Sequence, residues 1–196
     1  MALALACAAL MTGCADIAPT VREPEAGAKS MCYERIDLAG RFSVQYRKDG
    51  RDESAHGSFR WQQDGGSARV ELLSPLGQTL ATIDVTPESA TLTSAGQAPR
   101  IASDANALAV MLLGWPLPVT GLRDWLQGCT RDARGKRYAV ASEGITTPDG
   151  WRIAYPVWEA DGSVRRPKRI DLQHKGNSAV TDIALRLVLD EWQPRR

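Results

Sequence analysis

The sequence predicts a mainly β domain with a helical insert: an open antiparallel half-barrel of about 10 to 11 strands, with short helices covering its concave face. Stretches in which apolar and polar residues alternate recur along the chain, and turn residues separate them. One segment near the middle changes to a helical period. Because each strand has only one apolar face, so long a sheet must curl to bury that face.

The first two strands form a hairpin with a turn at residues 48–50. The apolar positions of the first strand are Leu38, Gly40, Phe42, Val44 and Tyr46. Those of the second strand are Gly57, Phe59 and Trp61. Glycine at two of these inward positions permits strong coiling and leaves room inside the sheet. Whether the interior is a filled core or a cavity stays open at this point.

Four shorter strands follow. Asp64-Gly65-Gly66 predicts a turn, and a strand with Val70 and Leu72 comes after it. The Pro and Gly of residues 74–77 predict the next turn. Further strands are expected at residues 79–85 and 90–93, and the chain pairs once more around Arg100 and Ile101.

Two short helices interrupt the strands. Ser103 is the expected N-cap of the first helix, which places Leu108, Met111 and Leu112 on one face and ends at Gly114. The two prolines of residues 115–118 cannot continue a helix. The second helix is expected from about residue 120 to residue 127, with Gly128 ending it. Its apolar face carries Leu122, Trp125 and Leu126.

Alternation then returns to the end of the chain. Strands are expected at residues 138–142, around residues 151–155 and at residues 168–173. The middle one carries Trp151, Ile153 and Tyr155 on one face. The last strand carries Ile183, Leu185, Leu187 and Leu189, and Trp192 closes the domain.

The N-terminal residues predict export and a lipid anchor. Residues 2–11 are almost entirely Ala, Leu, Cys and Met, a run too short to cross a bilayer as a helix. Gly13-Cys14 resembles a bacterial lipobox, so we expect a signal peptide at residues 1–13 and lipidation of Cys14. Ala15 directly after this cysteine implies delivery to the outer membrane, where the periplasm-facing domain at residues 31–196 hangs from a flexible tether at residues 14–30. The alternative is a buried N-terminal helix with a free cysteine.

The composition argues against several functions. A net charge of +1 gives no reason to expect nucleic-acid binding. Cys32 and Cys129 could pair in an oxidising compartment, but two cysteines far apart in sequence leave the question open. His56 and His174 both occupy polar strand positions, so we expect both to be solvent-exposed. Since there is no metal-binding motif, nucleophile elbow or phosphate loop, we expect no metal, no cofactor and no enzyme.

The order of these elements, and several short motifs within it, resembles the LolB family of outer-membrane lipoprotein receptors. The first matching segments are Gly40-Arg41-Phe42, Phe59-x-Trp61-Gln62 and Leu72-Leu73-Ser74-Pro75-Leu76-Gly77. Later ones are Gly114-Trp115-Pro116-Leu117-Pro118, Leu122-Arg123-x-Trp125-Leu126-x-Gly128 and Trp151-x-Ile153-x-Tyr155, with residues 167–172, Ile183 and Trp192.

The resemblance implies a monomeric receptor that takes lipoproteins from the periplasmic carrier LolA and inserts them into the outer membrane without a cofactor. Leu76, between Pro75 and Gly77, matches the apolar loop that helps release cargo, although a turn leucine can also fold back on the core. The candidate acyl-chain cavity residues are Phe42, Val44, Phe59, Trp61, Val70, Leu72, Leu108, Met111, Leu112, Leu122, Trp125, Leu126, Trp151, Ile153 and Tyr155. Each of these alone fits ordinary core packing equally well.

Three other functions stay open from the sequence. A lipid-anchored structural or assembly module would share the lipobox and the alternation, but its sheet would enclose a filled core. A carrier of fatty acids or glycolipids would use the same cavity for other ligands. An anchored hydrolase would need a cluster of Ser, His and Asp that the sequence does not reveal.

Overall fold

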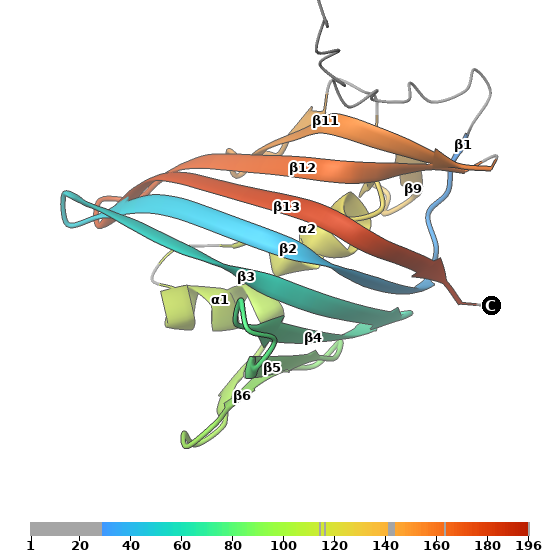
Figure 1. The fold of residues 1–196 in the computed structure, drawn as a ribbon. Helices are drawn as coiled ribbons and strands as arrows, with labels where there is room; N and C mark the ends of the chain where they lie inside the picture. The colour runs from blue at the N-terminus through green and yellow to red at the C-terminus, as the bar shows by residue number, and fades with distance from the viewer. Residues whose placement is uncertain (1–28, 114, 116, 141–143, 163, 196) are drawn as a thin grey trace, which may run out of the picture.

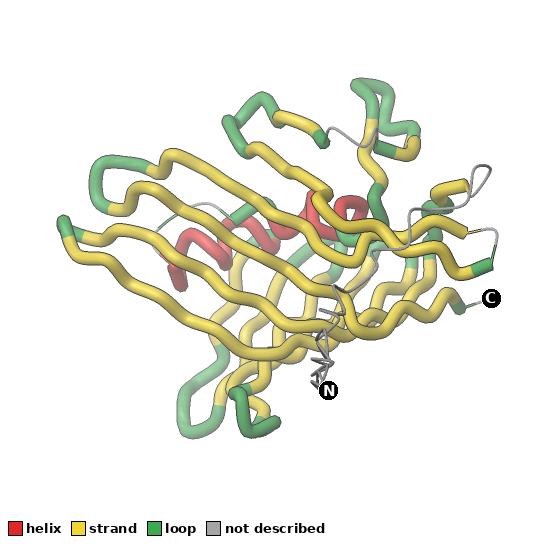
Figure 2. Tube along the Cα trace, turned by 45° about the horizontal axis from the view of Figure 1, so that its top comes forward, coloured by secondary structure: helices red, strands yellow, loops and turns green. Residues whose placement is uncertain are grey.

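The computed structural model describes residues 29–113, 115, 117–140, 144–162 and 164–195. Across these residues, one large curved sheet is covered on one face by two helices (Figures 1 and 2). The strand order is β10-β11-β12-β13-β2-β3-β4-β5-β6-β7, and β1 pairs only with β12. The two ends of this series do not meet, so the sheet is not closed into a barrel. The predicted open, mainly β fold with a helical insert is confirmed.

The elements follow the chain in a simple order. The sheet begins with β1 (Lys29–Ser30), β2 (Arg35–Lys48), β3 (Arg51–Asp64), β4 (Ser67–Leu73), β5 (Thr79–Val85), β6 (Ala90–Ser94) and β7 (Arg100–Ala102). Next come the helices α1 (Ala105–Leu113) and α2 (Val119–Trp125) and a separate hairpin of β8 (Cys129–Arg131) and β9 (Arg137–Ala139). The sheet is completed by β10 (Ile145–Thr146), β11 (Arg152–Asp161), β12 (Val164–Gly176) and β13 (Val180–Pro194).

The last strand, β13, pairs with β2 from the N-terminal part of the domain. β13 pairs antiparallel with β2 along most of its length, for example Leu187 with Phe42. Neighbouring strands of the sheet are antiparallel except at β1, which runs parallel to β12 at Lys29 and Ser30. The final two residues of the expected tether therefore add a strand to the sheet.

Two glycines on the concave face are each covered by a phenylalanine ring. Gly40 pairs with Phe59 across β2 and β3, and Phe42 pairs with Gly57 two positions further on. A Cβ on Gly40 would lie 3.0 Å from the Phe59 ring and would also collide with the Val188 carbonyl oxygen. The expectation that these glycines leave empty room was wrong, because the opposing rings fill it.

Helix α1 differs from its prediction in its cap and in the direction of one side chain. The cap is Asp104, not Ser103: the Asp104 carboxylate accepts the Ala107 N–H at 2.8 Å, and the Ser103 hydroxyl donates to the same carboxylate. Leu108 is buried, whereas Met111 is 55% exposed. Because successive helical residues turn by about 100°, Leu108 and Leu112 face the sheet and Met111 does not.

The C-terminal half contains two further differences. The strand expected at residues 138–142 is β9, which starts at Arg137 and pairs with β8 in a hairpin that the sequence pattern did not predict. Residues 141–143 lie outside the described residues. His56 is exposed as expected, but His174 is half-buried and stacks on Trp151 with ring centroids 5.0 Å apart. Its Nδ1 accepts the Gly176 N–H at 2.8 Å, which fixes the ring against the end of the sheet.

Candidate functional site

An apolar cavity of about 230 Å³ lies between the concave face of the sheet and the two helices. Its lining consists of apolar side chains alone. They are Phe42, Val44, Phe59, Trp61, Val70, Leu72, Ile83, Leu92, Ala105, Leu108, Ala109, Leu112, Leu113, Trp115, Leu117, Val119, Leu122, Leu126, Leu185 and Leu187. The interior of the half-barrel is therefore neither packed solid nor polar.

The period of each element explains how it contributes to this lining. β2, β3, β4 and β13 present every second residue to the concave face, as Phe42 and Val44 do from β2. α1 contributes residues at helical spacing, Leu108 and Leu112, and α2 contributes Leu122 and Leu126 in the same way. The lining therefore combines strand residues at every second position with helix residues spaced about one turn apart.

The structure places ten of the fifteen candidate cavity residues in the lining. Trp125, Trp151, Ile153 and Tyr155 are buried in the core outside it, and Met111 faces solvent. The lining also contains Leu185 and Leu187, whose alternation marked them as core but did not indicate that they border an empty space. Alternation in the sequence shows which face of the sheet a residue lies on. Only the packed structure shows which part of that face borders the cavity and which part is covered by other side chains.

The cavity is larger than a benzene-sized void and smaller than a typical ligand pocket. An engineered cavity of about 150 Å³ in another protein holds benzene. Drug-sized ligands occupy pockets of roughly 300–1,000 Å³. At about 230 Å³, this cavity has room for part of one long acyl chain in the conformation described.

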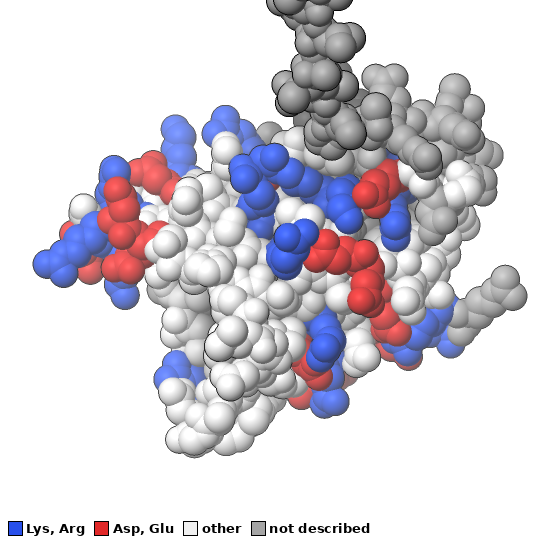
Figure 3. Space-filling model, in the orientation of Figure 1, with Lys and Arg blue, Asp and Glu red and all other residues white. Residues whose placement is uncertain are grey.

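The turn between β4 and β5 projects an apolar side chain into solvent. The Gly77 N–H donates to the Ser74 carbonyl at 2.9 Å, and the Ser74 N–H donates to the Gln78 carbonyl at 2.8 Å. Gly77 has a φ of 81°, a left-handed conformation that glycine adopts without strain. Pro75 is exposed, and Leu76 is 88% exposed at the tip. In Figure 3 the surface toward β6 and the β4–β5 turn is largely uncharged, whereas the tip of the β2–β3 hairpin carries both signs. Charged side chains on β4 and β5 form exposed ion pairs, such as Arg69 with Asp84.

The family model described as "Outer membrane lipoprotein LolB" matches residues 34–192. The chain belongs to the LolB family. A LolB of Cupriavidus pinatubonensis is 39% identical over 202 residues, which cover 96% of this chain and 92% of that protein. A LolB of Ralstonia nicotianae is 37% identical over 97% of this chain and 95% of that protein.

Among solved structures, a LolA superfamily protein from Nitrosomonas europaea aligns with a TM-score of 0.46 and 9% identity, covering 87% of this chain and 91% of that one. The assignment to LolB depends on the sequence matches alone. The outer-membrane location expected from Cys14 and Ala15 agrees with the description of the family. The family is one of lipoprotein-localisation proteins and not of enzymes.

The described residues of this LolB-family chain offer little for other chemistry. No three His, Cys, Asp or Glu side chains gather there in a way that would hold a metal ion. Neither of the two described helices is long and apolar enough to cross a membrane. Cys14 and the rest of residues 1–28 lie outside the described residues.

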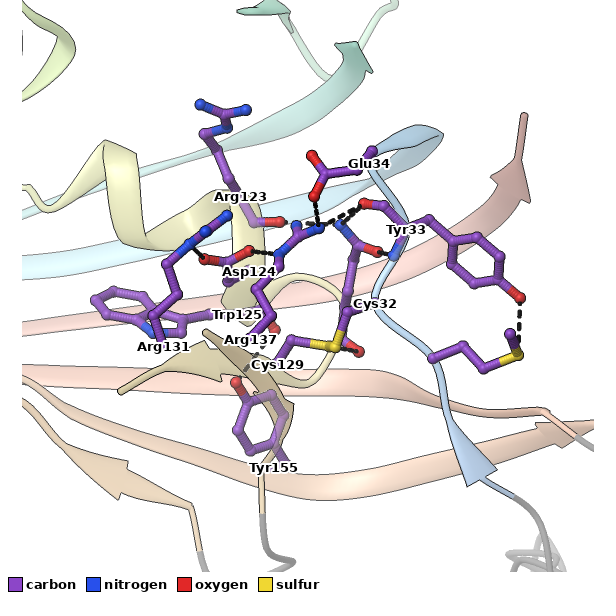
Figure 4. The surroundings of a disulfide bond; sticks show 12 residues. Cys32, Tyr33, Glu34, Arg123, Asp124, Trp125, Cys129, Arg131, Arg137 and Tyr155 are labelled. Carbon is purple, nitrogen blue, oxygen red and sulfur yellow. Dashed lines mark hydrogen bonds and ion pairs between the residues drawn. A yellow bond between two sulfur atoms is a disulfide. The ribbon is translucent and has the colours of Figure 1, made fainter. Parts of the chain in front are cut away.

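Helix α2 is held at its C-terminal end by a disulfide. Cys129, at the start of β8, is bonded to Cys32 in the segment before β2, with a Cα–Cα distance of 6.1 Å (Figure 4). The Gln127 side chain reinforces this attachment, because its oxygen accepts the Tyr33 N–H at 2.7 Å and its amide donates to the Tyr33 carbonyl at 3.1 Å. The pairing that the sequence left open therefore joins the N-terminal segment to the end of α2.

Ion pairs hold the same helix from another side. The buried Asp124 carboxylate lies between Arg131 and Arg137, and its contact with Arg131 is 2.6 Å (Figure 4). Arg137 continues the network to Glu34 at 3.0 Å. In the core below, the Tyr155 hydroxyl donates to the Trp125 carbonyl at 3.1 Å, and burial raises the pKa of Tyr155, so this donor stays protonated.

Helix α1 has a much lighter attachment. It contains no charged residue, and its buried side chains are Ala105, Leu108 and Ala109. Its polar contact with α2 is between exposed groups: the Asn106 oxygen accepts the Thr120 N–H at 3.2 Å, and the Asn106 amide donates to the Thr120 hydroxyl at 3.2 Å. Apolar packing over the cavity therefore supplies most of what holds α1 in place.

Proposed function

We propose that this protein is an outer-membrane receptor that accepts lipoproteins from the periplasmic carrier LolA, binds their acyl chains in the apolar cavity and inserts them into the membrane. Membership of the LolB family supports the general role. The observation that carries the finer proposal is the wholly apolar lining of the cavity. In an ordinary filled core these side chains would contact one another and leave no such space.

The energetics of acyl chains suit a transfer that needs no nucleotide. Burying each methylene is worth about 0.8 kcal/mol, so a 16-carbon chain exposed to water costs on the order of 12 kcal/mol. A lipoprotein with three such chains must remain covered throughout its passage. A receptor cavity that fits the chains somewhat better than the carrier's cavity draws them across, and the membrane then offers a still better environment.

The cavity must enlarge to receive a whole lipid. Its volume of about 230 Å³ is too small for three chains. Because α1 is attached mainly by apolar packing and α2 by a disulfide and ion pairs, we assign the opening movement to α1. Acyl chains would replace the apolar contacts that α1 loses, so the open state is stabilised by the cargo itself.

In this proposal Cys14 carries the lipid anchor, and residues 15–28 hold the domain beside its target bilayer. Leu76, with Pro75 and Gly77 shaping its turn, enters the membrane during release. The exposure of Leu76 at the tip supports this role, because an apolar side chain held in solvent gains free energy on entering lipid.

Binding of an apolar fluorescent probe tests the cavity. The domain at residues 31–196 should bind the probe, and a triacylated lipoprotein should displace it with a stoichiometry of one. Leu122→Asp, which places a charge in the lining, should abolish probe binding, while Arg152→Asp on the exposed face should not. A domain that ignores the probe, or a probe that lipoprotein cannot displace, would refute the proposal.

The insertion step has a separate test in a reconstituted transfer assay. Leu76→Glu should leave folding and uptake from LolA intact but block delivery to vesicles, because a carboxylate at the tip opposes entry into lipid. Tyr138→Glu, a change at another exposed apolar residue on the β8–β9 hairpin, is the matched control. Normal insertion by the Leu76 variant would remove this residue from the mechanism.

The same cavity also suits a carrier of free lipids. Depletion in cells separates the two functions. A receptor's loss leaves outer-membrane lipoproteins accumulated on the periplasmic carrier, whereas the loss of a free-lipid carrier leaves them correctly placed.

A further inference from the structure

A second, smaller pocket of about 130 Å³ adjoins the apolar cavity. The two share Trp61, Ala105 and Val119 as a common wall. The smaller pocket lies where the N-terminal ends of α1 and α2 meet the β3–β4 and β5–β6 turns. Unlike the main cavity, it has polar and charged groups in its lining, and these are Thr86, Asp104, Thr120 and Arg123.

Arg123 in this pocket is a half-buried cation without an ion pair among the described residues. One end of its guanidinium, Nη1, donates to the Gly66 carbonyl at 2.8 Å. Its Nε is buried and has no hydrogen-bond partner. Figure 4 shows the guanidinium directed away from the Asp124 carboxylate of its neighbour. A buried donor without a partner is costly, so an acceptor supplied by a ligand would be stabilised here.

Other arginines of this molecule show what the same edge of a guanidinium binds. In Arg41 the Nε and Nη2 groups grip the two oxygens of Asp190 at 2.9 and 3.0 Å. In Arg169 the same pair of nitrogens grips Asp171 at 3.0 and 2.6 Å. Arg123 lines the smaller pocket and has the same pair of donors, but its Nε has no hydrogen-bond partner in the protein. The edge is suited to a group with two acceptor oxygens.

The one carboxylate in the pocket lining is already in use. Asp104 caps α1, accepting the Ala107 N–H at 2.8 Å and the Ser103 hydroxyl at 3.1 Å. The hydrogen bond from the Ala107 N–H lowers the pKa of Asp104, which keeps it ionised. It is exposed to solvent and forms no ion pair with Arg123, so water screens its charge from a ligand in the pocket.

We infer that this pocket binds the oxygen-rich head group of an acyl ligand whose chain occupies the main cavity. The Nε edge of Arg123, which is covered in the conformation described, turns into the pocket on binding and donates to two head-group oxygens. The inference depends on the proposed function, because the main cavity must take the chain. Two lipids supply this chemistry: the ester and amide carbonyls of a triacylated cysteine, and the phosphate of a phospholipid. Arg123 then lets the site distinguish a head group from a bare hydrocarbon.

Competition against an apolar probe tests the pocket. Three competitors are used on the domain: a synthetic triacylated cysteinyl-serine, phosphatidic acid and hexadecane, which has no head group. In the wild-type domain, at least one of the two lipids should bind more tightly than hexadecane. Arg123→Gln should weaken that lipid about tenfold, the scale of a charge-assisted hydrogen bond, and leave hexadecane unchanged. Arg123→Lys, which keeps the charge but lacks the two-donor edge, should not restore full affinity.

The control is Arg100→Gln, a change at an exposed arginine of β7 that should alter none of the three affinities. The lipid that loses affinity identifies the source of the head group. If both lipids keep their affinity in the Arg123→Gln variant while hexadecane still binds, the head-group pocket is refuted and the acyl cavity stands. If none of the three displaces the probe, the proposed function fails and this inference fails with it.

Discussion

Helices α1 and α2 cover the same cavity, yet they are held by different kinds of interaction. α2 is attached by a covalent bond, by ion pairs of a buried aspartate and by side-chain bonds to the N-terminal segment. α1 has no charge and depends on apolar packing and one exposed polar contact. Apolar contacts are not directional, so acyl chains can replace them, whereas an acyl chain cannot replace the disulfide or the ion pairs that hold α2. One helix can therefore act as a cover and the other as a fixed wall.

The largest effect should come from removing the disulfide. It closes a loop of 97 residues, for which chain entropy gives about 4–5 kcal/mol of stabilisation. Cys32→Ser with Cys129→Ser should lower the free energy of unfolding by about 2–5 kcal/mol in urea titrations. A reductant should lower the stability of the wild-type domain similarly and leave the double variant unchanged. A loss below about 1 kcal/mol would show that α2 is held without the disulfide.

The next effect concerns the ion pairs of α2. Asp124→Asn leaves the buried Arg137 without its carboxylate, and removing one partner of a buried pair costs about 3–5 kcal/mol. We expect the free energy of unfolding, measured by chemical denaturation, to fall by about 2–3 kcal/mol. The loss is at the lower end because Arg131, the other partner of Asp124, is partly exposed. The matched control is Asp84→Asn, which breaks an exposed pair with Arg69 and should cost less than about 1 kcal/mol. Equal losses in the two variants would remove the distinction between the helices.

A smaller effect is expected where α1 meets α2. Asn106→Ala removes the exposed hydrogen bonds to Thr120 and should cost about 1 kcal/mol. If α1 is the cover, its amide hydrogens should then exchange faster and a bound probe should leave several-fold faster, while exchange in α2 stays the same. Gln173→Ala, which removes an exposed bond to Arg152 on the sheet, should change neither rate. Faster exchange in α2 rather than α1 would reverse the assignment.

The smallest effect should follow a change on the outer face of α1. Met111→Ser should alter the free energy of unfolding by no more than about 0.5 kcal/mol, because the side chain is exposed. Leu108→Ala, one turn earlier on the buried face, should cost about 2–5 kcal/mol. A large loss for the Met111 variant would mean that α1 buries the face that the sequence first suggested.

Much of the fold could be read from local patterns. The strand expected at residues 79–85 has those bounds in the structure, and the turns at residues 48–50 and 64–66 separate β2, β3 and β4 as expected. The hairpin of β8 and β9 was missed because β8 has only three residues, too few for alternation to be recognised, although a strand was expected at β9. Met111 was misplaced because a uniformly apolar helix gives little indication of which face is buried.

For the candidate site, the sequence indicated which faces are apolar but not which part of them is left uncovered. Ten candidates line the cavity, while Trp125, Trp151, Ile153 and Tyr155 are ordinary core residues with the same periodicity. Arg123 lies in a segment that matches the LolB family, but nothing in the sequence indicated that its Nε is buried and has no hydrogen-bond partner. Part of the pocket around it, including Gly66, Thr86 and Pro87, comes from turns more than thirty residues away in the chain.

The sequence by itself determined the open, mainly β fold, the position of the helical insert and membership of the LolB family, because alternation, turn residues and family motifs are local properties of the chain. Only the tertiary structure decided that Cys32 meets Cys129, that phenylalanine rings cover Gly40 and Gly57, and that a cavity remains beneath the helices. These features depend on how side chains from segments far apart in the sequence pack against one another. The pattern within a short stretch of residues does not determine that packing.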